Sequence, residues 1–168
     1  KAWLEASLRE AIQREEFILY YQPKLDCQGQ LHGYEALLRW QMSNGEMISP
    51  GDFIPLAEET GLIIPIGKWV INQAVEQIKR WQSEQGKENL VLAINVSAQQ
   101  FRDTSLEQDV AVALRNSGVP GHLLELEVTE SMLLGDFEQA RDRMMGLKEL
   151  GVCFALDDFG TGYSSLNY

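Results

Sequence analysis

Hydrophobic and polar positions along this chain alternate with two different periods. Within residues 3–13 the apolar side chains recur every three to four positions, which predicts a helix. The apolar and aromatic run 17–21 predicts a strand that ends before Pro23, and residues 32–40 predict a second strand. The polar segment 26–29 between them predicts a turn, so we expect the two strands to form a hairpin.

Helical and strand patterns then alternate strictly from residue 53 onward, after a loop predicted for residues 41–52. The predicted helices cover residues 53–60, 65–85, 106–117 and 137–150. The predicted strands cover residues 90–96, 123–129 and 152–157. This order indicates a parallel sheet with crossover helices, and the short apolar strands fit a sheet that is covered on both faces. Five strands are predicted in all.

The informative positions are the polar exceptions within these strands. Because side chains alternate along a strand, Glu35 and Arg39 share one face, and Glu125 and Glu127 share another. Asn95, Glu127 and Asp157 come at or near the carboxyl ends of successive predicted strands. That edge is where barrels and open α/β sheets bind their ligands, so we expect these side chains to converge there.

A convergence of carboxylates with an amide oxygen is typical of a site for a hard divalent cation. Buried carboxylates are unfavourable unless they are paired or bind a metal. The set contains Glu35, Asn95, Glu127, Asp157 and Asp158 and no His or Cys, which favours Mg²⁺ or Mn²⁺ over zinc. Asp157 and Asp158 are adjacent where the strand ends, so each could serve one of two ions.

Each of these residues also has a purely structural interpretation. Glu35 could form an ion pair with Arg39, and Asn95 could cap the segment that follows it. Asp157 and Asp158 could form a turn or cap a helix. Spacing alone leaves these alternatives open.

Composition narrows the classes of partner. The 168 residues carry 14 Lys and Arg against 25 Asp and Glu, a net charge of −11, which disfavours binding to a nucleic acid polymer. Cys27 and Cys153 form no spacing motif and are expected to be free thiols of a reducing compartment. No apolar run approaches the ~20 residues that span a bilayer, so we expect no membrane span in this chain.

Several motifs in this sequence resemble the EAL domain, the bacterial phosphodiesterase domain of cyclic di-GMP. Tyr34-Glu35-Ala36-Leu37-Leu38-Arg39-Trp40 resembles its signature. The other motifs follow in the family's order: Tyr20-Tyr21-Gln22-Pro23, Phe53-Ile54-Pro55-Leu56-Ala57-Glu58, Thr60-Gly61-Leu62-Ile63, Asn95-Val96-Ser97, Glu127-Val128-Thr129-Glu130-Ser131 and Asp157-Asp158-Phe159-Gly160-Thr161-Gly162-Tyr163-Ser164-Ser165-Leu166. Together they extend over nearly the whole chain.

The resemblance implies a fold and an activity. The fold would be a TIM-like (β/α) barrel of EAL type whose first strand runs antiparallel to the others. Residues 1–168 would be a C-terminally truncated EAL domain with about five of eight strands. The reaction would be the metal-dependent hydrolysis of cyclic di-GMP to linear pGpG in bacterial second-messenger signalling.

The resemblance also assigns roles to matching positions. Glu35, Asn95, Glu127 and Asp157 would hold the first Mg²⁺ or Mn²⁺, and Asp158 would turn to a second ion. Gln22, Leu38 and Arg39 would contact the cyclic dinucleotide, with Arg39 on a phosphate oxygen. Glu130 would anchor the loop that begins at Asp158. Glu35, Asp157, Asp158 and Glu130 are thus the expected catalytic group.

One departure from the family pattern keeps alternatives open. The family continues beyond this point with strands that carry a catalytic Lys and another metal-binding Glu. The chain could therefore be an inactive fragment, or a receptor that binds the dinucleotide without turnover, and a third interpretation is an unrelated metal-dependent barrel enzyme. The resemblance also implies a homodimer, a sensory or GGDEF domain at the N-terminal side, and a cytoplasmic location, which could be that of the cytoplasmic domain of a membrane-anchored protein.

Overall fold

A single twisted sheet forms the centre of the protein in the computed structural model, which describes residues 2–157. Its strands are β1 (Phe17–Leu25), β2 (Leu31–Gln41), β3 (Met47–Ile48), β4 (Val91–Asn95), β5 (Leu124–Thr129) and β6 (Cys153–Asp157). The strand order is β1-β2-β4-β5-β6, and β3 pairs with β2. β1 runs antiparallel to β2, whereas β2, β4, β5 and β6 are mutually parallel. The antiparallel first strand is therefore confirmed.

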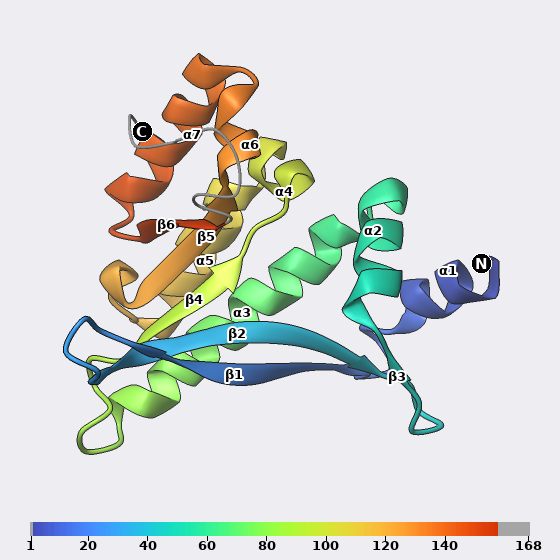
Figure 1. Ribbon diagram of the computed structural model, residues 1–168, viewed down its shortest axis with the longest axis horizontal. Helices are drawn as coiled ribbons and strands as arrows, with labels where there is room; N and C mark the ends of the chain where they lie inside the picture. Colours follow the sequence, from blue (N-terminus) through green and yellow to red (C-terminus); the bar gives the residue numbers. More distant parts are fainter. Residues whose placement is uncertain (1, 158–168) are drawn as a thin grey trace.

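Helices follow the parallel strands as crossovers (Figure 1). They are α2 (Pro50–Thr60), α3 (Ile63–Gln82), α4 (Ala98–Arg102), α5 (Leu106–Ser117), the short 3₁₀ helix η1 (Gly121–Leu123), α6 (Glu130–Leu134) and α7 (Phe137–Glu149), whereas α1 (Ala2–Glu10) precedes the sheet. α3 contacts β4 and α5, and α5 contacts α7. None of the helices within residues 2–157 is long and apolar enough to cross a membrane.

The apolar side chains form two cores. The larger one lies between the parallel strands and their helices and includes Leu92, Leu126, Ile78 and Leu147, each about 1% exposed or less. Burial of this kind stabilises a fold by about 25 cal/mol per Å² of apolar surface. It also fixes which face of each strand points away from the helices, and that other face carries the polar residues predicted above.

The second core joins the N-terminal helix to the hairpin and to α2. Trp40 and Phe53 are fully buried there and meet edge to face, with 5.5 Å between ring centroids. Leu8 of α1 packs into the same cluster. The end of β2 that carries Arg39 is therefore anchored on one side by a rigid aromatic cluster.

The structure corrects several predicted boundaries. β1 does not end before Pro23 but continues to Leu25, with Pro23 opposite Tyr34. Within the described sheet β1 is an edge strand with β2 as its neighbour, so a residue without an N–H is tolerated. The predicted loop 41–52 contains β3 and the first turn of α2, where Ser49 caps the helix before Pro50.

Three short helices, η1, α4 and α6, were not predicted. Two residues separate the start of α4 from the end of β4, whereas α6 begins directly after β5, and five residues are too few to show a helical period. α4 starts with a capping box in which Ser97 and Gln100 satisfy each other's backbone N–H groups. α4 and α6 thus follow the carboxyl ends of β4 and β5, which carry Asn95 and Glu127.

Candidate functional site

The strand register brings four of the predicted site residues onto one face of the sheet. Gln22 of β1 lies opposite Glu35 of β2, and Glu35 lies beside Ala93 of β4. Asn95, two residues beyond Ala93 and therefore on the same face, lies beside Glu127 of β5. A row of polar side chains thus crosses β1, β2, β4 and β5, of which Glu35, Asn95 and Glu127 were expected from the strand pattern and Gln22 from the family resemblance.

The amide of Asn95 connects two strands of this row. Its Nδ2 donates a hydrogen bond to Oε2 of Glu35 at 3.1 Å. Among residues 2–157 no ion pair joins Glu35 to Arg39, so the alternative in which Glu35 only neutralises Arg39 is wrong. The alternative in which Asn95 caps the next helix is wrong as well, since the N-cap of α4 is Ser97.

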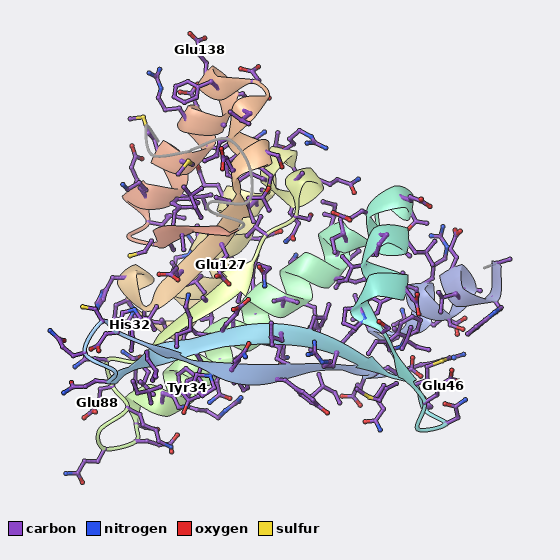
Figure 2. All side chains as sticks on the ribbon, viewed as in Figure 1. His32, Tyr34, Glu46, Glu88, Glu127 and Glu138 are labelled. Atoms are coloured by element: carbon purple, nitrogen blue, oxygen red, sulfur yellow. The ribbon has the colours of Figure 1, made fainter. Side chains whose placement is uncertain are left out.

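Lys24 is part of this face and was missed by the sequence analysis. Its ammonium donates to Oε2 of Glu125 at 3.0 Å and lies 3.6 Å from Oε2 of Glu127, whose side chain is only 10% exposed. Figure 2 labels Glu127 on β5, well inside the outline of the molecule, in contrast to Glu46 and Glu138 at its periphery. Alternation with Gln22 could have found Lys24, had the strand been extended beyond Pro23.

The acidic character of this face is visible in the pKa of Lys24. Burial by itself would lower this pKa, but the hydrogen bond to Glu125 and the charges of Glu125, Glu127 and Glu35 outweigh it and raise the pKa above its ordinary value. Lys24 is therefore a cation at neutral pH. Three carboxylates act on one ammonium, so the face keeps an excess of negative charge.

Arg39 and Leu38 line a cleft next to this row. The cleft has a volume of about 350 Å³ and is also bordered by Asn95, Ser97 and Thr129, at the carboxyl ends of β4 and β5. The guanidinium of Arg39 lies over the ring of Tyr20, 5.5 Å from its centroid, and donates to the Leu38 carbonyl oxygen at 3.0 Å. These contacts hold a cation at the wall of a cleft that adjoins the carboxylates.

The remaining predicted residues are only partly described. The backbone of Asp157 pairs with Thr129. The side chain of Asp157 and all of Asp158 lie outside the described residues, and so does the loop that Glu130 is expected to anchor. Glu130 itself is the first residue of α6. The roles of these three residues stay predictions.

The chemistry of the donors that are described fits a hard divalent cation. Within residues 2–157 no three His, Cys, Asp or Glu side chains are grouped closely enough to hold a metal. Asn95 adds an amide oxygen to the carboxylates of Glu35 and Glu127, and an all-oxygen set of this kind suits Mg²⁺ or Mn²⁺. A complete coordination shell would need further ligands. The sequence analysis predicts that Asp157 and Asp158 are among them.

Comparison with known proteins gives one consistent family. The family model described as the EAL domain matches residues 5–168. The bifunctional diguanylate cyclase/cyclic di-GMP phosphodiesterase MucR of Pseudomonas aeruginosa is 45% identical over 163 residues, which are 96% of this chain and 24% of MucR. The cyclic di-GMP phosphodiesterase PdeR of Escherichia coli is 39% identical over 165 residues, which are 98% of this chain and 25% of PdeR.

The fold gives the same result. The solved structure of the PaMucR phosphodiesterase in complex with cyclic di-GMP superimposes with a TM-score of 0.91 at 42% identity and covers 99% of this chain. This chain spans about a quarter of the curated relatives named above and 67% of that structure. The open sheet is thus an incomplete TIM-like barrel. A family model that matches residues 5–168, together with a fold that superimposes over 99% of this chain, places this chain in the EAL domain family.

Proposed function

We propose that the protein hydrolyses one phosphodiester bond of cyclic di-GMP to linear pGpG, with one or two Mg²⁺ or Mn²⁺ ions, in bacterial second-messenger signalling. One observation carries the proposal. Asn95 borders the cleft whose wall holds Arg39, and it joins that cleft to Glu35, through its hydrogen bond, and to Glu127, its neighbour on β5, so an anionic ligand and a divalent cation could meet there. The relatives named as cyclic di-GMP phosphodiesterases support the choice of substrate.

The cation would be held by oxygen ligands of this chain. Glu35, Asn95 and Glu127 would bind the first ion together with Asp157, and Asp158 would serve a second ion. When bound, such an ion lowers the pKa of a water ligand and neutralises phosphate charge. Asn95 keeps Glu35 oriented through its 3.1 Å hydrogen bond, so this carboxylate is preorganised as a ligand.

The substrate would be positioned by residues of β1 and β2. Arg39 would contact a phosphate oxygen, since a guanidinium presents several donors in fixed geometry. Gln22 is exposed and lies opposite Glu35, where its amide would contact the dinucleotide beside the metal site. Leu38 would give apolar contact from the cleft wall. Glu130 would act at a distance, by anchoring the loop that begins at Asp158.

Binding of an anionic dinucleotide by a chain of net charge −11 needs local compensation. Arg39 supplies one positive charge at the cleft, and the bound cations would supply the rest. We also propose a homodimer, a sensory or GGDEF domain at the N-terminal side and a cytoplasmic location, which follow from the same family membership. A receptor that binds without turnover is the outcome that would replace the enzyme.

The decisive variant is Glu35→Ala in the protein at full length. We expect turnover of cyclic di-GMP to fall by at least about a hundredfold and Mn²⁺ affinity to fall with it, because a metal ligand is lost. The urea midpoint should change little, because Glu35 is only half-buried. Turnover is measured as pGpG released, and Mn²⁺ affinity by calorimetry.

The matched control is Glu46→Ala, which removes an exposed carboxylate from the turn that precedes β3. It should leave turnover and Mn²⁺ affinity unchanged. Unchanged turnover in Glu35→Ala would contradict the metal assignment. Tight binding of cyclic di-GMP by the wild-type protein in Mn²⁺, with no pGpG formed, would select the receptor instead.

A further inference from the structure

Lys24 makes a contact that the strand order alone would not allow. It lies on β1, whereas its partners Glu125 and Glu127 lie on β5, and both β2 and β4 separate these strands in the sheet. Strands in a flat sheet are about 4.8 Å apart, so β1 and β5 would be roughly 14 Å apart. The 3.0 Å contact from Lys24 to Glu125 therefore spans the hollow side of a strongly curved sheet, as in the interior of a barrel.

Small residues beneath Lys24 leave room for this crossing. Gly33 lies directly opposite Lys24 on β2, and Ala93 lies beside Glu125 on β4. A Cβ atom on Gly33 would lie 1.9 Å from the Val91 carbonyl oxygen, so no larger residue fits there. On β2 no side chain therefore stands beside Lys24 on this face, and on β4 the neighbour of Glu125 carries only a methyl group.

We propose that Lys24 is a positioning residue that fixes Glu127 in the metal-free protein and lowers the affinity of the site for a divalent cation. This inference rests on the proposed function, since it concerns the same metal site. The ammonium of Lys24 lies 3.6 Å from Oε2 of Glu127. A divalent cation bound by Glu127 would therefore be repelled by this ammonium. Glu125, which comes two residues before Glu127 on β5, holds the ammonium more closely, at 3.0 Å, and so competes with Glu127 for it.

The two members of this pair act in opposite directions. Without Lys24, Glu125 and Glu127 are left as neighbouring carboxylates on one face of β5, and a divalent cation relieves their repulsion. Without the charge of Glu125, the ammonium of Lys24 is attracted to Glu127 alone and competes more strongly with the cation. A merely structural role of the ion pair would predict the same direction for both changes.

The test compares Lys24→Met and Glu125→Gln in the protein at full length. For Lys24→Met we expect Mn²⁺ to bind about three- to tenfold more tightly, measured by calorimetry. We also expect the melting temperature of the metal-free protein to fall and the rise on adding Mn²⁺ to grow, because the cation then replaces the lost ammonium. For Glu125→Gln we expect Mn²⁺ to bind about three- to tenfold more weakly.

Two controls complete the design. Lys24→Arg keeps the positive charge at this position and should therefore bind Mn²⁺ with the wild-type affinity. Lys87→Met removes an exposed ammonium that pairs with Glu84 at 3.1 Å. Lys87 precedes the amino end of β4, whereas the site lies at the carboxyl end, so this variant should change neither the Mn²⁺ affinity nor the melting temperature. Weaker or unchanged Mn²⁺ binding in Lys24→Met overturns the inference. Tighter Mn²⁺ binding in Glu125→Gln overturns it as well, so the inference can be tested even if Lys24→Met does not fold. Absence of Mn²⁺ binding in the wild-type protein overturns the proposed function, and this inference with it.

Discussion

Two buried glutamates of this protein are stabilised in opposite ways. Glu16, 3% exposed, accepts hydrogen bonds from Trp40 Nε1 at 3.0 Å and from the backbone N and Oγ of Ser43 at 2.8 and 2.7 Å. Glu127, 9% exposed, lies on the same face as Glu125 and the Asn95–Glu35 pair, within 3.6 Å of the ammonium of Lys24. One carboxylate is surrounded by neutral donors, and the other belongs to a group of like charges.

The difference shows that burial alone does not mark a functional carboxylate. Glu16 joins the start of β1 to the turn that follows β2, and neutral donors of the protein form hydrogen bonds with both of its carboxylate oxygens. Around Glu127 the excess of negative charge favours a further cation. The contacts of Glu16 give it a structural role, whereas the role proposed for Glu127 is that of a metal ligand, and three predictions separate these roles.

The largest effect is expected for Glu127→Gln. Loss of the carboxylate removes a proposed metal ligand, so turnover of cyclic di-GMP should fall by at least about a hundredfold. The free energy of unfolding should change by less than about 1 kcal/mol. The substitution removes one of several neighbouring negative charges, and Lys24 still forms its ion pair with Glu125. Rates of pGpG formation and urea unfolding measure the two effects, and a variant that kept wild-type turnover would disprove the ligand role.

Glu16→Gln should show the reverse pattern. The amide turns one acceptor into a donor that faces the Ser43 or Trp40 donors, so we expect the free energy of unfolding to fall by about 2–3 kcal/mol. Turnover per folded molecule should stay within about twofold of the wild type, because Glu16 does not touch the site. Urea unfolding monitored by tryptophan fluorescence measures the loss. A large drop in turnover at full folding would show that the two regions are coupled.

The smallest effect is the pH dependence that Glu16 contributes. Burial by itself would raise the pKa of Glu16, but the hydrogen bonds from Ser43 and Trp40, with a smaller effect of Arg14, lower it below its ordinary value of 4.5. A carboxyl whose pKa is lowered by folding stabilises the protein above the pKa of the unfolded state and loses this contribution as pH falls through the folded-state pKa. The stability advantage of the wild type over Glu16→Gln should thus be constant from pH 7 to pH 5 and shrink below about pH 4.5. An advantage that grew towards acid would contradict the assigned direction.

Much of the fold could be predicted because its helices and strands are long or strongly patterned. α5 was predicted with its observed bounds, and the strand predictions for β4, β5 and β6 were correct to within a residue or two at each end. β3 was missed because two residues show no alternation, and α4 and α6 were missed because five residues are too few to show a helical period. Pro23 misled the prediction because its effect depends on whether the strand lies at an edge, which is a tertiary fact.

The chain's own pattern of residues determined which side chains face the site. Alternation along β2 and β5 placed Glu35 and Glu127 on the inward face, and the motif order identified the family. Only the tertiary structure decided the partners of those side chains. Lys24 and Glu125 are 101 positions apart, and their ion pair exists because the curved sheet brings the ammonium of Lys24 within 3.0 Å of the carboxylate of Glu125. Glu16 directly precedes an apolar strand in the sequence, and only the folded structure encloses it with Trp40 and Ser43. Periodicity is a local property of the chain, whereas charge compensation depends on distances between side chains that are far apart in the sequence, and only the folded structure sets these distances.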